Sequence, residues 1–320
     1  MAQATGSNAK LIYDVETAFG TTPASPAAVL AYFKEEGFAQ DIDLITSSVL
    51  SGNRNPSAPV SGNRSVKGSI TTELAPFGQG VFLKHLMGSL TTSGTTNYTH
   101  TFKIGALPTS LCFEKGFTDL GKYFLYNGVR ISKASFDFKP SGFVDVSYEF
   151  AGQKETVSDT SFDATPSDLG HTPFEGFQAT ILEGGSSIGT VTALKIDIDN
   201  DLQTDLYVIG GGGLVNSLPE GNVKVSGTAT VIFDSITLYN KAVNGTESSL
   251  KVSMTKGTGL GSAGNEYFEM LLPELRYKAS TPTIKDSKGI MLDLPFEGYY
   301  SNSSEASAIQ IVLKNTQATL

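Results

Sequence analysis

Apolar and polar residues alternate along several short segments of the chain. In residues 144–150 every second side chain is apolar, and in residues 223–231 every second position is apolar or glycine. A period of two places these side chains on one face of a β-strand and the polar side chains on the other. Each segment therefore predicts a strand with one buried face and one face toward solvent.

Two other segments have the spacing of a helix. Ile236, Tyr239 and Val243 fall on one helical face, and residues 77–86 repeat this spacing. A glycine follows each segment, at a position where glycine commonly ends a helix. We predict two short helices in a chain that is otherwise rich in strands.

The pattern of strand and helix occurs twice. Residues 66–88 align without gaps to residues 223–245, at a constant offset of 157 positions. The likeness returns where Phe150-Ala151-Gly152 matches Phe296-Glu297-Gly298. Chance similarity of short strands rich in Gly, Ser and Thr is the alternative explanation. We predict a mainly β protein of two tandem domains, each with one short helix.

The domain boundaries follow from the composition of the joint. Residues 154–172 are rich in Ser, Thr, Asp and Pro and contain few apolar side chains. Such a composition is typical of an exposed linker. We place the first domain at residues 1–153 and the second at residues 173–320.

Residues 47–64 are polar, turn-rich and long for a loop inside a compact domain. Two arginines stand there in an otherwise acidic protein, which suits an arm that contacts an acidic partner surface. A solvated, mobile loop is the alternative. The candidate contact residues are Ser51, Asn53, Arg54, Asn55 and Arg64.

The overall charge argues against nucleic-acid binding. The formal net charge is −9, so the chain lacks the basic character of proteins that grip phosphates. Cys112 is the single cysteine, which excludes a disulfide within the chain. The first ten residues lack the pattern of a secretory signal, and no apolar run approaches the length of a membrane span. We expect assembly inside a cell, without a membrane.

No pattern indicates a cofactor, a metal or catalysis. The three histidines lack a partner at a metal-binding spacing, and the acidic run 197–201 lacks the glycine and glutamate of an EF-hand loop. The glycines at 210–213 are not followed by the Lys-Ser/Thr of a phosphate-binding loop. A β-rich carbohydrate hydrolase is the enzymatic alternative, although the chain has no Trp for stacking against sugars.

Several segments, in their order along the chain, resemble one family. The run YDVETAFGTTP at residues 13–23 is similar to the start of tail tube proteins from long, non-contractile phage tails. Residues 66–70, 128–131 and 150–152 resemble strand signatures of that family, and so do residues 225–227. The resemblance covers nearly the whole chain.

The resemblance implies a fold and an assembly. Each domain would consist of two packed antiparallel sheets with a flanking helix, and sheets would join across subunits into a closed, β-lined ring. Two such domains in one chain would close a pseudo-six-fold ring as a trimer, with a hexamer as the alternative. The implied location is the virion tail, assembled in the cytoplasm of the bacterial host. The implied partners are further copies, the tape measure protein, the tail terminator and the distal tail proteins.

The resemblance also gives roles to two groups of residues. Loop 47–64 would contact the next ring, and genomic DNA would pass through the ring without specific binding. A neutral or negative wall would let phosphates slide past. Carboxylates on the polar faces of strands are candidates for this wall, and exposure on the outer surface is their alternative. A capsid decoration protein or a β-sandwich adhesin is the alternative function. The wall candidates are Asp137, Asp145, Asp197 and Asp199.

Overall fold

A computed structural model describes residues 3–50, 52, 54–279, 281–282, 284 and 289–320. The described chain is mainly β, as predicted, and its helices are α1 (Gly80–Met87) and α2 (Thr237–Val243), with 3-10 turns η1 (Gly6–Asn8) and η2 (Gly176–Gln178). The strands are β1 (Ala9–Val15), β2 (Val29–Leu30), β3 (Glu35–Glu36), β4 (Ala39–Ile45), β5 (Val60–Glu73), β6 (Gly88–Ser93), β7 (Tyr98–Ile104), β8 (Leu111–Phe117), β9 (Lys122–Phe138), β10 (Asp145–Gly152), β11 (Lys154–Ser158), β12 (Ala179–Glu183), β13 (Ser186–Ser187), β14 (Val191–Asp199), β15 (Lys224–Ile232), β16 (Ser248–Thr255), β17 (Tyr267–Tyr277), β18 (Met291–Gly298) and β19 (Gln310–Asn315).

Both helices lie where the spacing of apolar residues predicts them. The residue after α1 is Gly88, with φ of 87°, and Gly245 after α2 has φ of 59°. A side chain with a Cβ is strained at such angles, so glycine ends the helix at low cost. α1 buries Phe82, Leu83 and Leu86 against the sheets and thereby closes one end of the core.

The strands of the two halves pair in the same order. The first half runs β1–β8–β9–β10–β5, with β3 and β4 beyond β5. The second half runs β12–β16–β17–β18–β15–β14. β11 and β19 take equivalent places beside β9 and β17. A tandem repeat would produce this common order; the domain boundaries themselves stay a prediction.

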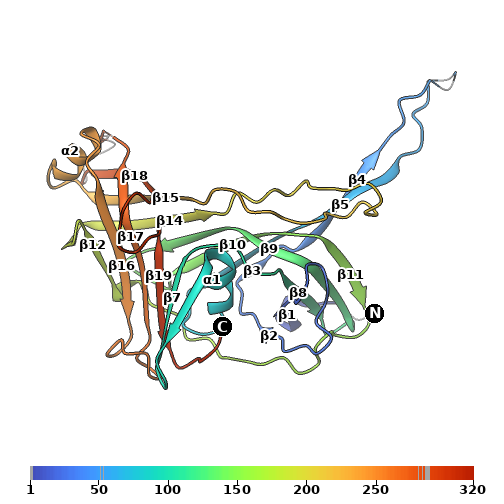
Figure 1. Cartoon of the computed structure of the whole chain (residues 1–320), viewed down its shortest axis with the longest axis horizontal. Coiled ribbons are helices and arrows are strands. Elements are labelled where there is room, and N and C mark those ends of the chain that lie inside the picture. Colours follow the sequence, from blue (N-terminus) through green and yellow to red (C-terminus); the bar gives the residue numbers. More distant parts are fainter. Residues whose placement is uncertain (1–2, 51, 53, 280, 283, 285–288) are drawn as a thin grey trace.

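Strand β9 connects the sheets of the two halves. Its first part pairs with β8 and β11, and its last part pairs with β10 and with β14. One sheet therefore continues from β4 through β5, β10, β9, β14 and β15 to β18 (Figure 1). The core beneath it is also continuous, since Phe136 of β9 stacks on Phe268 of β17 with ring centroids 6.4 Å apart.

A hairpin of β6 and β7 makes the two halves different. It is inserted between α1 and β8, and β7 pairs along β19 at the far end of the chain. His100 of β7 is buried there and lies 3.2 Å from Asn315 of β19. Only four residues separate α2 from β16, so the second half has no room for such a hairpin. The hairpin adds a second strand-to-strand contact between the halves.

The predicted linker 154–172 differs in part from an exposed connector. Its first residues form β11, which pairs with β9. Asp163 accepts a hydrogen bond from the backbone N–H of Ala28 at 3.0 Å, which ties the segment to the first half. Composition cannot reveal this, because the ladder uses backbone groups that every residue carries.

Candidate interaction surfaces

The continuous sheet has one apolar and one polar face. Phe136, Tyr148 and Ile196 are fully buried on the core side. On the opposite face Asp145 stands directly across from Asp137, and Asp137 stands across from Lys195. Residues opposite each other in a ladder share a face, so this polar surface crosses the junction between the halves.

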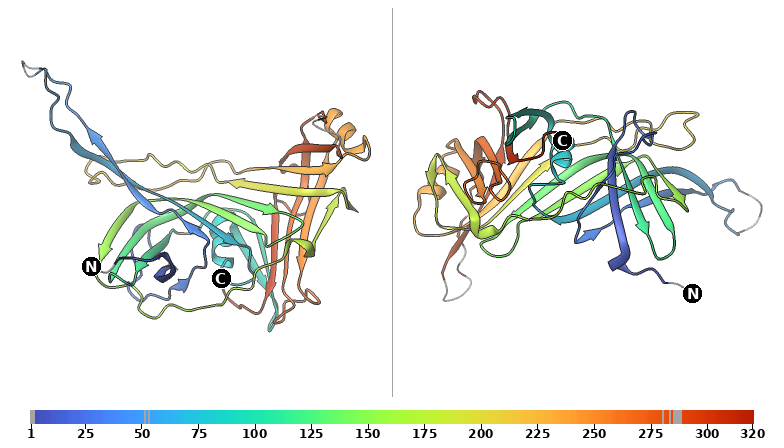
Figure 2. Two further views of the ribbon diagram at one scale, coloured as in Figure 1. Left: turned by 180° about the vertical axis from the view of Figure 1, so that it is seen from behind. Right: turned by 90° about the horizontal axis from the view of Figure 1, so that it is seen from below.

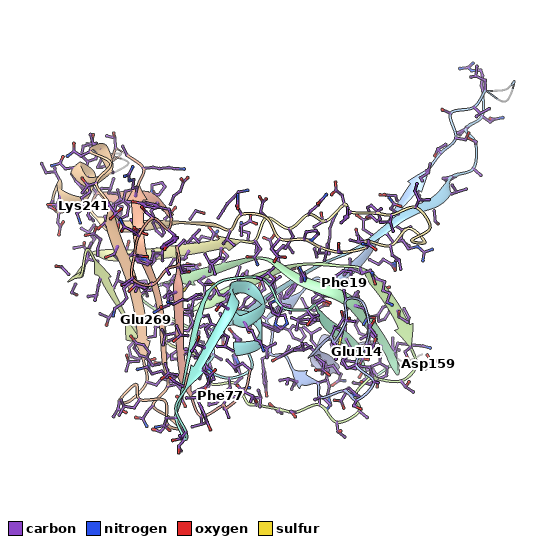
Figure 3. The ribbon with its side chains drawn as sticks, viewed as in Figure 1. Phe19, Phe77, Glu114, Asp159, Lys241 and Glu269 are labelled. Carbon is purple, nitrogen blue, oxygen red and sulfur yellow. The ribbon has the colours of Figure 1, made fainter. Side chains whose placement is uncertain are left out.

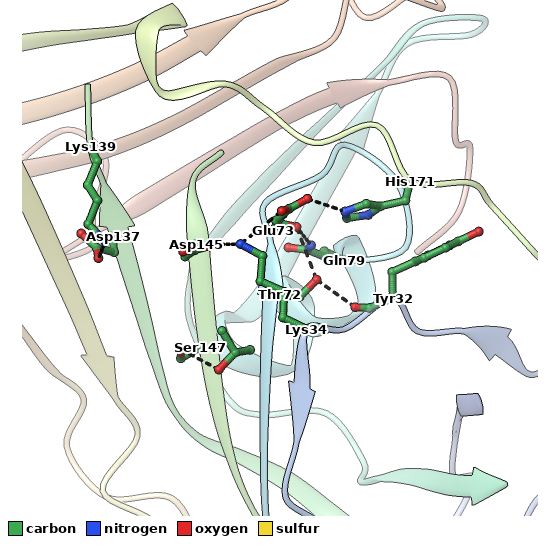
Figure 4. Close-up of polar contacts among 11 residues, drawn as sticks. Tyr32, Lys34, Thr72, Glu73, Gln79, Asp137, Lys139, Asp145, Ser147 and His171 are labelled. Carbon is green, nitrogen blue, oxygen red and sulfur yellow. Dashed lines mark hydrogen bonds and ion pairs between the residues drawn. The ribbon is translucent and has the colours of Figure 1, made fainter. Parts of the chain in front are cut away.

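All four predicted wall residues lie on this polar face. Asp137 and Asp145 are cross-strand neighbours, as Figure 4 shows. Asp197 and Asp199 follow on β14, across from Ser135 and Lys133 of β9. A shallow depression between these strands is lined by polar side chains alone, so it suits water and ions better than an apolar ligand.

Lysines neutralise much of the acidic charge on the polar face. Lys34 bridges Asp145 at 2.6 Å and Glu73 at 3.1 Å, and Lys139 lies 2.5 Å from Asp137. The hydrogen bond to Asp145 raises the pKa of Lys34, although burial acts in the other direction. The face is therefore a mosaic of paired charges, less acidic than the aspartates alone indicate.

A long hairpin projects from one edge of the sheet. β4 and β5 extend well beyond the body, and their connecting loop is the most distant part of the molecule (Figures 1 and 2). We call β4, this loop and the first residues of β5, positions 39–64, the arm. Its exposed apolar side chains are Ile42, Leu44, Ile45, Val49, Leu50 and Val60.

Exposed apolar side chains of this kind mark a contact surface. Leu50 is 97% exposed and Val49 is 80% exposed. The sequence-based hypothesis named polar residues and missed these apolar ones. The alternation of Ile42 and Leu44 with aspartates was the available signal, since it indicates a strand whose apolar side chains need a partner.

The predicted contact residues of the arm fall into three groups. Ser51 and Asn53 lie outside the described residues. Arg54 is exposed beside the tip, and Asn55 follows it. Arg64 was expected in the loop but belongs to β5, which begins at Val60, so the loop spans only residues 46–59. Pairing of Ile45 with Val60 extends the hairpin beyond what the turn-rich composition indicates.

A second loop, residues 200–223 between β14 and β15, runs beside the arm (Figure 1). The N–H of Arg64 donates to the carbonyl of Gly213 at 2.7 Å. Val215 and Leu218 are buried against Ala151, so this loop is packed onto the first half. Its tip exposes Ile209 completely, beside the base of the arm. Sequence reasoning saw only a glycine-rich turn here.

Buried charged groups elsewhere have local structural partners. Glu16 accepts hydrogen bonds from the N–H groups of Gly20 and Gly128 and from the side chain of Asn127. Lys241 lies 2.8 Å from Glu183. Figure 3 shows Lys241 and the buried Glu114 of β8 at opposite ends of the body.

Reactive side chains are few in the described chain. Burial raises the pKa of the Cys112 thiol to about 12, and burial lowers the pKa of His85 to about 4. Among the described residues no three His, Cys, Asp or Glu side chains converge as metal ligands. No helix in the described chain is long and apolar enough to cross a membrane.

Comparison with known proteins identifies a family that covers most of the chain. A family model described as phage tail tube protein matches residues 6–298. Among curated proteins, none matches the chain at a significant level. The family match includes the arm, the polar face and the second loop.

Proposed function

The chain belongs to the phage tail tube protein family, and from this we propose that its copies close into rings, which stack into the hollow tube of a long, non-contractile tail. The role is structural and involves no catalysis. Genomic DNA leaves the virion through this tube without specific binding. The chain acts in the virion tail after assembly in the cytoplasm of the bacterial host.

The observation that supports ring formation most strongly is the β9–β14 junction. Two sheets meet there edge to edge, with six residue pairs in register from Leu194↔Phe138 to Asp199↔Lys133. The strand order on both sides is the same, so the same junction can be made again between chains. Repetition around an axis closes a ring and removes the open sheet edges, which are otherwise prone to aggregation.

We propose that the two halves are copies of one tube domain, at residues 1–153 and 173–320. Each ring then contains three chains and has pseudo-six-fold symmetry, and a hexamer of chains is the alternative. The polar face lines the lumen, because the opposite face of the same sheet is already buried in the core. The arm contacts the neighbouring ring along the tube. The tape measure protein occupies the lumen before ejection, and terminator and distal tail proteins close the two ends.

Electron microscopy tests the assembly itself. Purified protein is expected to form hollow rods or stacked rings, and end-on class averages are expected to show strong three-fold symmetry with weaker six-fold features. The reason is that two similar but unequal halves alternate around the axis. Protein that stays a lone globule at all concentrations would contradict the proposal, and so would a solid fibre without a lumen.

A second test concerns the lumen wall. Exchange of Asp137, Asp145 and Asp197 for lysine is expected to leave tubes intact and to make them retain DNA. The lysines would attract phosphates from a closed wall, and retention would fall steeply as salt rises. Fluorescence anisotropy of a labelled DNA fragment with purified tubes measures this.

The matched control changes the charge equally on loops away from the polar face. Asp159 and Asp168 are exposed there and Asp119 is half-buried, and the same three substitutions by lysine are expected to cause less DNA retention. Equal retention by both variants would show that Asp137, Asp145 and Asp197 do not line the lumen.

A further inference from the structure

We propose that residues 38–41 of one chain pair antiparallel with residues 276–279 of the next chain, continuing the register that β14 and β9 use inside the chain. This inference rests on the proposed ring. It names the two edges that meet, and it pairs Ala39 with Lys278 of a second copy. We call this contact the interchain seam.

The internal junction supplies the template. β14 lies antiparallel to β9, with Ile198 across from Ala134 and Asp199 across from Lys133. The ladder continues one step further, where the N–H of Asn200 donates to the carbonyl of Ser132 at 2.8 Å. Hydrogen-bonded and non-hydrogen-bonded residue pairs alternate along an antiparallel ladder. Because Asn200 and Ser132 form a hydrogen-bonded pair, Asp199 and Lys133 next to them form a non-hydrogen-bonded pair.

The end of β17 occupies the place that β9 has in the first half. The N–H of Lys278 donates to the carbonyl of Pro295 in β18, just as Lys133 stands across from Glu149 of β10. On the other side β16 pairs only as far as Leu275. Among the described residues no strand pairs with this edge of the chain beyond Leu275, and Lys278 and Ala279 are exposed.

Residues 35–39 occupy the place of β14. Ala39 is paired with Lys67 of β5, as Asp199 is paired with Lys224 of β15. The N–H of Gly37 donates toward β5, to the carbonyl of Ser69 at 2.8 Å. The backbone N–H groups of successive residues point to opposite sides of a strand. The N–H groups of the residues before and after Gly37 therefore point away from β5, toward the open edge.

In the free chain this edge is capped by its own side chains. The outward N–H of Phe38 donates to the Glu36 carboxylate at 3.1 Å, and the carbonyl of Phe38 accepts from Lys115 at 3.0 Å. Glu36 and Lys115 also form an ion pair at 2.9 Å. Capping of this kind protects an edge strand from indiscriminate pairing. Ring closure replaces Glu36 at the Phe38 N–H with a backbone carbonyl of the neighbouring chain, and replaces Lys115 at the Phe38 carbonyl with a backbone N–H. The Tyr126 hydroxyl, 3.2 Å from the same carbonyl, can stay.

Charge complementarity agrees with the proposed register. With Ala39 across from Lys278, Asp41 comes to stand across from Arg276. Both side chains are exposed in the free chain. Opposite charges directly across a ladder favour the pairing, whereas a shift by one residue would turn them to opposite faces.

A disulfide between chains tests the seam. The double variant Ala39→Cys with Lys278→Cys places two thiols at a non-hydrogen-bonded pair, where the Cβ atoms of facing strands are close enough for a disulfide. After mild oxidation of assembled protein we expect most chains to run as covalent dimers and trimers on a non-reducing gel. Reductant should return them to single chains. The native Cys112 is buried and does not compete.

Two matched variants make the result interpretable. Lys133→Cys with Asp199→Cys copies the geometry inside the chain, and it should give a faster-migrating single chain. Gln40→Cys with Lys278→Cys puts the two thiols on opposite faces and should give few covalent oligomers. A ladder of bands that ends at three or at six chains supports the seam, and its end counts the chains in the ring.

The seam and the ring can fail separately. If electron microscopy shows rings of the Ala39/Lys278 variant but the gel shows only single chains, the seam is wrong and the ring stands. If the off-register variant crosslinks as well as the designed pair, the register is wrong. If the wild-type protein forms no rings or tubes, the proposed function fails first, whatever the gel shows.

Discussion

Replacement of residues 46–59 by Asn-Gly is expected to abolish tube growth while leaving soluble protein that still closes into rings. Ile45 and Val60 face each other at the end of the hairpin, so a two-residue turn of this type can join them. The removed loop carries Val49 and Leu50, which lie outside the core and contribute nothing to it. Sedimentation and tube lengths in electron micrographs measure the effect.

A smaller change separates the apolar contact from loop length. The double variant Val49→Ser with Leu50→Ser keeps the loop and removes its two most exposed apolar side chains, and it should shorten tubes strongly. Val157→Ser is the control, because Val157 is 54% exposed on β11, outside the loop 46–59. Tubes of normal length from the shortened loop would exclude the arm from ring stacking.

Loss of the Glu16 carboxylate is expected to be the most damaging single substitution for stability. Glu16 is fully buried, and the Glu16→Ala variant would leave the donors of Gly20, Gly128 and Asn127 without an acceptor. Each buried donor left without an acceptor costs about 1–3 kcal/mol, and several donors lose theirs here. Urea unfolding followed by circular dichroism measures the change in the free energy of unfolding.

An exposed carboxylate provides the comparison for Glu16. Asp159 pairs with Lys122 at the surface, where its side chain is 78% exposed. Removal of an exposed ion pair changes stability by about 1 kcal/mol or less, so Asp159→Ala should unfold close to the wild-type urea midpoint. Similar midpoints for the Glu16 and Asp159 variants would show that the buried network contributes little.

The motif that led to the family resemblance acquires a physical role in the fold. Glu16 belongs to the run of residues 13–23, and its carboxylate ties the end of β1 to the turn at Gly128 inside β9. Gly128 has φ of 66°, which favours glycine at this turn. Sequence alone marked these residues as a signature; only their contacts explain why an acid and a glycine are needed there.

Local patterns in the sequence determined the class of fold and much of its order. The period of two predicted the strands, the period near 3.6 with a terminal glycine predicted both helices, and alternation placed the four aspartates on polar faces. These features depend on neighbours along the chain, so the sequence contains them directly. The resemblance of residues 13–23 and of the later strand segments was sufficient to predict the family.

The tertiary structure alone decided how the halves are joined. The β9–β14 junction, the β7–β19 contact and the packing of loop 200–223 beside the arm bring together residues that are far apart in sequence. Backbone hydrogen bonds make most of these contacts, and backbone groups are the same in every residue. Lys34, which pairs with Asp145, likewise comes from a distant part of the chain, so this part of the mixed charge on the polar face could not be read from the sequence.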